Sequence, residues 1–537
     1  MAKAVRTPLG GRLLLRAGLL LGAAIPAHAT LATDWQTVVN NAVVAPQAVP
    51  NGTTPYFFSY NQPAVNQAGK VAFRARAKPP GGQGGSDATT QGVYYRQLSL
   101  ANSQVGIVAD NTGVPVPAPN NTGATFIEFP STARIDSTTG MITTRGQSQG
   151  VFTLPDGTRE GTSGIYATPG DALTTAASQL GNIPDYNYFQ VPDTAPGIRF
   201  DQFPGSPAPL RNRFIVFKGN YTETDIAMTG IFYRDMLASG GTAPVRRIAR
   251  TGTPIPGGGG AIFGSTAPPS AATDPGNGRS KVVFAGFDNE DRPTAGGIYI
   301  TYLDRPQSLR PIISLGDVVP GAPGFVFTGF GEAVSFDGRY VSFWGSWGKS
   351  KKIVHENCPT DGNKYLIAYC LEQYPNGADL TESVNQGVFR ADTQNQTVRM
   401  VARTQKPTGF TDFLYWTYSG KPPGSPGGGD AEPPRWRSSA FTAVTSLALA
   451  FKGQKASIDG LYVYRRGSVQ TVLDTTMDGQ SVDPMAPLGS LVSAIGLERD
   501  GFRGSWLAIS AGMTNTTTAE TWAGLYAHDC GKVCSVW

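Results

Sequence analysis

The residues best suited to chemistry gather in one loop rich in glycine and proline, residues 420–444. Its charged and aromatic members include Asp430, Glu432, Arg435, Trp436 and Arg437. An aromatic ring flanked by two guanidinium groups can stack on a sugar ring while the arginines pair with a uronate or a sulfate. The alternative is a flexible loop whose tryptophan packs on a neighbouring element. These five residues, with Glu332 from a preceding loop of the same kind, are the candidates for ligand binding.

A second long stretch, residues 345–386, also departs from its surroundings. Its candidate chemical groups include His355, Tyr365, Tyr369, Cys358 and Cys370. Long loops in compact domains are often functional, and a disulfide would order this one. His355, Tyr365 and Tyr369 are therefore secondary candidates.

A third stretch, residues 184–199, combines Tyr186, Tyr188 and Phe189 with two turn-forming prolines, Pro192 and Pro196. We expect these aromatic side chains to pack rather than to bind a ligand.

The four cysteines are Cys358, Cys370, Cys530 and Cys534. In an exported chain an even number of cysteines normally forms disulfides, and local pairing of the first two and of the last two is the simplest of three connectivities. A metal site built from these cysteines with His355 and His528 is the alternative. The CxxC pairs typical of such sites are missing from the sequence. We expect two disulfides, no metal site and no cofactor.

Familiar catalytic motifs are also missing. The sequence holds no GxSxG, HExxH, P-loop or CxxCH motif, and beyond residue 29 it has only two histidines. A glycoside hydrolase needs two carboxylates facing each other across a cleft, which Asp430, Glu432 and Glu332 can supply. A lyase acting on uronates needs a tyrosine or histidine to move the proton and an arginine or lysine to neutralise the carboxylate. The loops contain such residues, so both chemistries stay open.

These loops interrupt a unit that occurs seven times. Each unit has an apolar strand ending in a small residue, followed by a strand that opens Gly-(Val/Ile/Leu)-(Tyr/Phe). The first strands are 71–75, 141–144, 214–218, 282–285, 341–344, 449–452 and 506–509. The second strands begin at Gly92, Gly164, Gly230, Gly297, Gly387, Gly460 and Gly524. A spacing of about 70 residues indicates a repeat architecture.

The repeated strands favour an all-β fold. Runs of Val, Ile, Phe and Tyr bounded by Gly, Pro, Asn and Asp are typical of strands, and consecutive apolar positions suit strands covered on both faces. The blades of a β-propeller meet that condition. We predict a seven-bladed propeller, with six or eight blades as alternatives because the second unit is poorly formed. The last unit lacks a fourth strand, and an isolated strand at 56–60 is expected to complete it and close the ring.

The position of each loop follows from which strand is innermost. If the first strand of each unit lines the central channel, the loops that lead into it lie at the channel mouth, where propellers usually bind ligands. Residues 420–444 and Glu332 then lie at the mouth, and residues 345–386 lie on the opposite face.

Two segments resemble known repeat families. Residues 66–73 read Asn-Gln-Ala-Gly-Lys-Val-Ala-Phe and are followed by Gly92-Val93-Tyr94. This pattern resembles the secreted bacterial tandem-repeat proteins named for an NxxGxxAF unit. Residues 335–343 are similar to the repeat of TolB-type, WD40-like propellers. Both resemblances imply a propeller-like fold, and neither implies a defined activity or catalytic residues.

The chain begins with the pattern of a secretory signal peptide. Residues 1–29 contain a basic segment, a short apolar core and an Ala27-His28-Ala29 cleavage site, so we expect a secreted or periplasmic protein cleaved near Ala29. Removal of this segment leaves 40 basic residues against 39 acidic ones, which speaks against a nucleic-acid partner. No later stretch reaches the roughly 20 apolar residues of a membrane span. The predicted plan is a signal peptide (1–29), an N-terminal extension (30–54) and one propeller (55–537) with insertions at 346–385 and 420–444.

Two functions fit these expectations. The first is a monomeric binding or scaffold module that recognises an extracellular polysaccharide or a cell-surface glycan at the channel mouth. The second is a secreted polysaccharide-active enzyme, a uronate lyase before a glycoside hydrolase. Fold alone does not choose between them.

Overall fold

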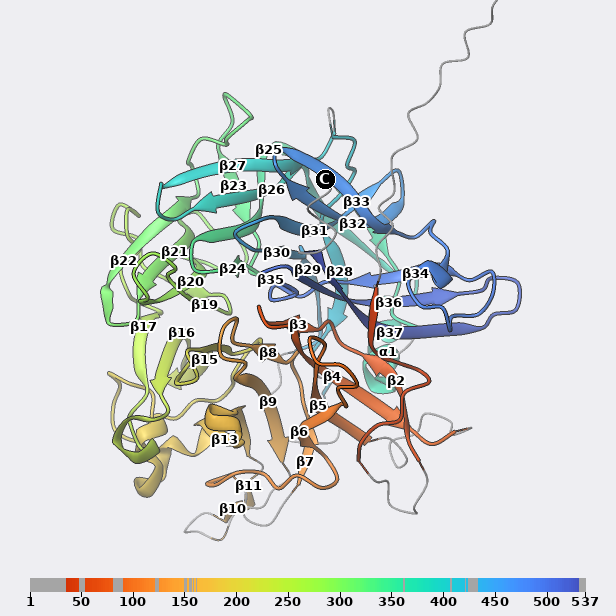
Figure 1. Cartoon of the computed structure of the whole chain (residues 1–537). Helices are drawn as coiled ribbons and strands as arrows, with labels where there is room; N and C mark the ends of the chain where they lie inside the picture. Colours follow the sequence, from red (N-terminus) through yellow and green to blue (C-terminus); the bar gives the residue numbers. More distant parts are fainter. Residues whose placement is uncertain are drawn as a thin grey trace, which may run out of the picture. The chain divides into compact units, whose positions relative to one another are not determined.

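The computed structural model describes residues 35–47, 54–80, 90–120, 125–148, 152–153, 157, 159–160, 162–360, 363–405, 408–420, 422–423 and 433–530. Within them the chain forms seven antiparallel sheets arranged as a β-propeller (Figure 1). The first three blades are β2–β6 (Tyr56–Tyr60, Ala64–Val65, Lys70–Lys78, Thr90–Gln97, Gly106–Asp110), β7–β9 with β12 and β13 (Phe126–Glu128, Arg134–Ile135, Ile142–Ser148, Ser163–Ala167, Thr174–Ser178), and β14–β17 (Ala208–Leu210, Phe214–Glu223, Ile226–Asp235, Arg246–Arg250).

The other four blades continue in chain order. They are β18–β22 (Ser265–Thr266, Ser270–Thr273, Ser280–Phe287, Gly296–Tyr302, Arg305–Ser314), β23–β27 (Phe327–Phe330, Ser335–Phe336, Tyr340–Glu356, Ala378–Asp392, Thr397–Arg403), β30–β33 (Thr442–Val444, Leu449–Lys455, Ile458–Arg465, Ser468–Asp474), and β34–β37 (Leu491–Gly496, Phe502–Arg503, Trp506–Thr514, Thr521–Asp529) with β1 (Gln36–Asn40). Two small hairpins lie outside these sheets: β10 with β11 (Phe152–Thr153, Arg159–Glu160) and β28 with β29 (Tyr415–Ser419, Arg435–Ser439).

The ring closes through its innermost strands. The short strands β3, β8, β14, β19, β24, β30 and β35 each contact the next in this order, and β35 contacts β3. An apolar core fills each of the seven spaces between neighbouring blades. The prediction of seven blades is therefore confirmed, and the counts of six and eight are excluded.

The strand that closes the ring is a different one from the strand expected. Gln36–Asn40 pairs with β37 and is the outermost strand of the last blade, whereas Tyr56–Tyr60 pairs with β4 in the first blade. Val38 and Val39 are fully buried, and Asn40 Nδ2 donates to Asp483 Oδ2 at 2.7 Å. The closing strand thus lies inside the segment 30–54 that had been expected to be an extension. An N-terminal strand still removes the free edge of the last sheet.

The Gly-x-aromatic motif has a steric cause. Residues two apart lie on the same face of a strand, so the ring of the aromatic residue folds back over the glycine. A Cβ atom on Gly92 would lie 2.7 Å from the hydroxyl of Tyr94, and one on Gly460 would lie equally close to that of Tyr462. Only glycine leaves room for the ring, which fills the core between blades.

The apolar first strand of each repeat unit was expected to line the central channel. The inner strand is instead the strand that precedes it in the sequence. In most blades it is broken into two short pieces, such as β2 and β3, which both pair with β4. The apolar first strands of the sequence repeat are consequently the second strands of the blades. This shift by one strand places the connection after each apolar strand, such as residues 345–386, on the face where the chain enters the inner strand.

Candidate functional site

The inner strand of the sixth blade carries an insertion. Asp412 forms a bridge with Gln454 of β31, and after the insertion Thr442–Val444 pairs with the same strand. Between these two points the chain leaves the blade as the β28–β29 hairpin, in which Ser419 pairs with Arg435 and Tyr415 with Ser439. Part of the stretch expected to be a loop is therefore strand.

The β28–β29 hairpin brings arginines to two other blades. Arg435 pairs with Glu290, which lies in the connection between β20 and β21 of the fourth blade. Partial burial raises the pKa of Glu290, but the hydrogen bond and charge of Arg435, followed by the charges of Lys218 and Arg437, outweigh burial and lower it. Lys218 belongs to β15 of the third blade. Arg435 thus pairs with Glu290 within reach of the positive charges of Lys218 and Arg437, and we call Lys218, Glu290, Arg435 and Arg437 the mouth cluster.

Trp436 lies on the other face of the hairpin. Its ring centroid is 5.3 Å from that of Tyr418 and 6.2 Å from that of Tyr374. Adjacent residues of a strand point to opposite faces, so Trp436 cannot form one surface with Arg435 and Arg437. The tryptophan packs on a neighbouring element, which was the alternative interpretation. Trp436 does not share a surface with the two arginines, and its role in ligand binding stays a prediction.

Trp436 packs against the insertion of the fifth blade. There β25 and β26 extend beyond the sheet as a hairpin, in which Lys352 pairs with Glu382 and His355 with Asp379. Helix α1 (Lys364–Gln373) sits at its tip, capped by the side chain of Asn363. The predicted disulfide between Cys358 and Cys370 is present, with an S–S length of 2.07 Å.

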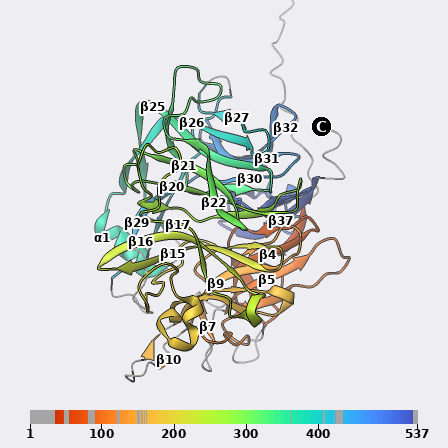
Figure 2. The same ribbon diagram turned by 90° about the vertical axis from the view of Figure 1, so that its left-hand side faces the viewer.

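The insertions of the fifth and sixth blades share one face. Cys358, Cys370 and Tyr418 form a small apolar core, against which Tyr369 and Trp436 pack. Figure 2 shows α1 and β29 close together at one side of the ring. The expectation that residues 345–386 lie on the face opposite the other insertion was wrong, because the sixth-blade insertion leaves the inner strand at Asp412, beside Gln454 near the end of β31, and not in the connection directly before β31.

The secondary candidates have separate environments. His355 Nδ1 lies 2.8 Å from Asp379 Oδ1 on the exposed side of the hairpin, and Tyr365 is exposed on α1. Tyr369 packs in the small core near the disulfide. The structure therefore spreads these three residues over one insertion without joining them into a catalytic group.

Glu332 occupies the turn between the inner strands β23 and β24 and is exposed.

Asp430 and Glu432 lie outside the described residues. Cys534 also lies outside them, so the second predicted disulfide stays a prediction. His528 is buried in the last blade, with its ring edge-on to Trp35 at 5.9 Å.

A buried polar cluster, missed from sequence, joins the two hairpins at their base. Trp416 Nε1 donates to Glu382, and Lys352 pairs with both Glu382 and Asp412. Burial first, and then the hydrogen bond and charge of Asp412, raise the pKa of Glu382 to about 7, although Trp416 and Lys352 act in the opposite direction. Lys352, Glu382 and Asp412 come from separate parts of the sequence, so residue spacing did not predict this cluster. We call this group the base cluster.

A second buried cluster fills the ring of inner strands. Arg134 on β8 donates to both carboxylate oxygens of Asp500, at 2.5 and 3.1 Å, and Arg503 on β35 pairs with the same carboxylate. The two guanidinium groups also reach carbonyls or hydroxyls of the inner strands of other blades, at Pro269, Ser270, Phe336 and Val444. Burial raises the pKa of Asp500, but Arg134 and Arg503 outweigh burial and lower it to about 2. This ion cluster ties the blades together at the axis.

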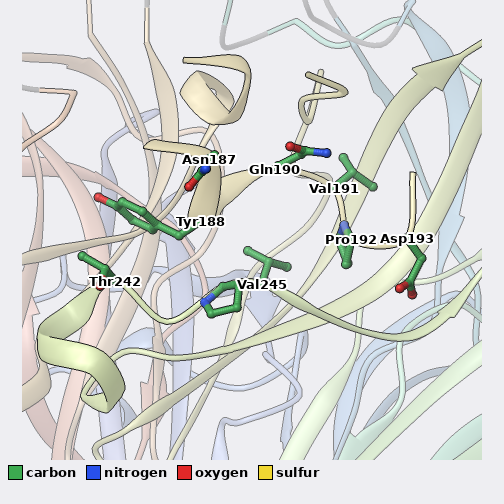
Figure 3. A pocket seen from close by; sticks show the side chains of 9 residues that line it. Asn187, Tyr188, Gln190, Val191, Pro192, Asp193, Thr242 and Val245 are labelled. Carbon is green, nitrogen blue, oxygen red and sulfur yellow. The ribbon is translucent and has the colours of Figure 1, made fainter. Parts of the chain in front are cut away.

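The third aromatic stretch borders a hollow at the edge of the third blade, away from the mouth cluster. Nine residues line about 420 Å³ there (Figure 3): Asn187, Tyr188, Gln190, Val191, Pro192, Asp193, Thr242, Pro244 and Val245. Phe189 is buried as expected, whereas Tyr188 lines the hollow.

Some features are missing from the described part of the chain. No group of three or more histidine, cysteine, aspartate or glutamate side chains there is placed to hold a metal ion. No helix in the same residues is long and apolar enough to cross a membrane.

Comparison with solved structures finds similarities at low sequence identity. The chain is similar to an oligogalacturonate lyase in complex with manganese (10% identity, TM-score 0.40, 93% of this chain and 98% of that chain). It is also similar to the polysaccharide lyase Uly1 (11% identity, TM-score 0.40, 90% and 94%) and to the β-propeller domain of the Trilobed protease from Pyrococcus furiosus (10% identity, TM-score 0.38, 88% and 93%). These likenesses concern the fold alone.

No curated protein sequence gives a significant match to this chain. A family profile described as a family of unknown function (DUF7453) matches residues 33–357, which is more than half of the chain. The chain therefore belongs to the DUF7453 family.

Proposed function

We propose that this protein is an exported binding module that recognises an anionic glycan, such as a uronate polysaccharide, at the mouth cluster. The observation that carries the proposal is the exposed pairing of Arg435 with Glu290, within reach of the positive charges of Lys218 and Arg437. Cations gathered in this way attract an anion, and guanidinium groups suit carboxylates because they donate two parallel hydrogen bonds.

The exposure of the cluster supports recognition of a ligand. The side chains of Arg435 and Glu290 are 45% and 44% exposed, so a polymer from solution can reach them. An exposed ion pair adds little to the free energy of unfolding, typically about 0–1 kcal/mol. The fold therefore depends little on the pair between Arg435 and Glu290. A ligand carboxylate can compete with Glu290 for Arg435 without rearranging the ring.

The disulfide and the amino-terminal sequence support export. A bridge between Cys358 and Cys370 suits an oxidising compartment. The signal peptide itself lies outside the described residues. The resemblance of residues 66–73 to the secreted NxxGxxAF repeat proteins also supports export.

A second candidate, a lyase acting on uronate polymers, has one observation in its favour. The base cluster holds a carboxyl group with a raised pKa beside a lysine, and perturbed acids of this kind gather at catalytic sites. The side chain of Glu382 is only 1% exposed, however, and both histidines lie elsewhere, one with Asp379 and one beside Trp35. Binding without chemistry is the better-supported function.

The test uses purified protein with polygalacturonate, alginate and a neutral dextran. Binding is measured by calorimetry, and chain cleavage by absorbance of the unsaturated product. We expect binding of at least one uronate polymer, no absorbance rise, and loss of most affinity in Arg435→Gln. Arg305→Gln, an exposed arginine on the outer strand β22, is the matched control and should bind normally.

Two outcomes contradict the binding module. Uronate binding that is equally strong in Arg435→Gln, Arg437→Gln and the control would remove the mouth cluster from the account. An absorbance rise that is lost in these variants would establish the lyase instead.

A further inference from the structure

The hollow beside the third blade is built by two irregular segments. One wall is the irregular stretch containing the short 3₁₀ helix Pro184–Phe189, and the other is the connection from the short 3₁₀ helix Ala238–Gly241 to the start of β17. The amide of Val245 donates to the carbonyl of Tyr188 at 3.0 Å and joins the two walls.

A buried arginine fixes both walls. Arg234 of β16 is only 1% exposed and donates to the carbonyls of Ala243, at 2.8 Å, and Gly241 in one wall. It also donates to the carbonyls of Thr175 and Ala176 of the second blade. Its guanidinium carbon lies 5.1 Å from the ring centroid of Tyr188 in the other wall. The hollow is therefore preorganised, which lowers the entropy that ordering a site on binding would cost.

The lining combines one aromatic ring with neutral hydrogen-bonding groups. Tyr188, Pro192, Pro244 and Val245 supply apolar surface, and Asn187, Gln190 and Thr242 supply amides and a hydroxyl (Figure 3). The one carboxylate of the lining, Asp193, pairs with Arg247 at 3.3 Å. The charge of Asp193 is thus balanced by Arg247.

We propose that this hollow is a second carbohydrate site, which binds a neutral pyranose residue. A pyranose has an apolar face of C–H groups that suits a tyrosine ring and a rim of hydroxyls that suits amides. A volume of about 420 Å³ lies within the usual range of small-ligand sites, about 300–1,000 Å³. The site is independent of the proposed mouth site, because the two share no residue.

The experiment is saturation-transfer NMR of the purified protein with the methyl glycosides of glucose, galactose, mannose and N-acetylglucosamine. We expect transfer to at least one of them. Tyr188→Ala should weaken its affinity about tenfold, as expected for one aromatic contact. Tyr186→Ala, in the same short helix but outside the lining, is the matched control and should leave affinity unchanged.

A second variant keeps the test decisive if Tyr188→Ala misfolds. Thr242→Trp fills the hollow from its exposed rim and should abolish transfer while the thermal unfolding midpoint stays unchanged. Arg435→Gln should retain the transfer, so failure of the mouth site is distinguished from failure of this one. Absence of transfer from all four sugars, or transfer that persists in both Tyr188→Ala and Thr242→Trp, would overturn the proposal.

Discussion

Two arginine–carboxylate groups in this propeller use the same chemistry in opposite surroundings. Arg134, Asp500 and Arg503 meet inside the ring of inner strands, with side chains at most 4% exposed. Arg435 and Glu290 meet on the face that carries the β28–β29 hairpin and are nearly half exposed. Burial separates the two roles: the inner group fixes the blades, and the outer group is available to a ligand.

Burial also changes how much the free energy of unfolding falls when each ion group is disrupted. A buried charge that loses its partner keeps its full desolvation cost, whereas an exposed charge is solvated again by water. The inner cluster should therefore affect stability and the mouth cluster should affect binding. The following predictions test this division.

The largest effect is expected from Asp500→Ala. This change leaves Arg134 and Arg503 buried without their carboxylate, and the free energy of unfolding should fall by about 3–5 kcal/mol. Chemical denaturation at pH 7 measures the loss. Arg435→Gln serves as the comparison and should change stability by less than about 0.5 kcal/mol. Equal losses in the two variants would contradict the division.

The pH dependence of stability should follow the same cluster. The pKa of Asp500 is lowered to about 2 in the folded protein, from an ordinary value of 3.8. Its stabilisation is thus present above pH 3.8 and is lost as the pH falls toward 2. Acid unfolding curves of the wild type and of Asp500→Asn should converge at the low end of this range. Parallel curves would be inconsistent with the assignment.

Removal of the disulfide, by Cys358→Ser with Cys370→Ser, should act locally. The bridge closes a short segment with a sequence separation of 12 at the tip of the β25–β26 hairpin. The opening free energy of α1 should fall by about 2–3 kcal/mol, with a smaller change in the global unfolding midpoint. Hydrogen exchange of residues 363–374 measures the first quantity. Unchanged protection of α1 would show that packing against Trp436 suffices.

Glu382→Gln should remove a pH dependence from the base cluster. The pKa of Glu382 is raised from 4.5 to about 7, so the folded state holds the proton more strongly than the unfolded state. The stabilisation of the folded state by this proton is fully present below pH 4.5 and is lost as the pH rises toward 7. At pH 8 the glutamine variant should be more stable than the wild type by about 1–2 kcal/mol. A lower stability at pH 8 would show that the carboxylate is needed ionised.

The smallest effect is expected from Glu290→Gln. This change removes the carboxylate that competes for Arg435, so affinity for polygalacturonate should rise a few-fold at low salt. The gain should shrink as ionic strength rises, because salt screens exposed charges. Calorimetry at two salt concentrations measures it. A loss of affinity would mean that Glu290 itself contacts the ligand.

The sequence predicted the blades well because their signal is local. Gly92 and Tyr94 stand two residues apart in one strand, and the same close approach of the aromatic ring recurs at Gly164, Gly230, Gly387, Gly460 and Gly524. The inner strands were assigned wrongly because they are short and broken: Tyr56–Tyr60 was predicted as a strand but was given to the last blade, and β3 has only two residues, Ala64 and Val65. The closing strand Gln36–Asn40 was overlooked, although it is as long as Tyr56–Tyr60.

The candidate site was predictable in part. The charged loop was recognised from Arg435, Trp436 and Arg437, but the alternation of side chains along β29 separates the tryptophan from the arginines. Glu290 was missed because it comes from another blade, about 145 residues away in sequence. Asp500 was missed because an aspartate directly before a glycine, here Gly501, is typical of a tight turn. Such partners are set by ring closure, which spacing along the chain does not reveal.

The most direct test compares the inner and outer groups in one experiment. Asp500→Asn, Arg435→Gln and the control Arg305→Gln are each measured for thermal unfolding and for affinity toward polygalacturonate. We expect Asp500→Asn to lower the unfolding midpoint, and Arg435→Gln to lower affinity at an unchanged midpoint. Full affinity in Arg435→Gln, with its fold intact, would contradict the central claim that the mouth cluster binds the ligand.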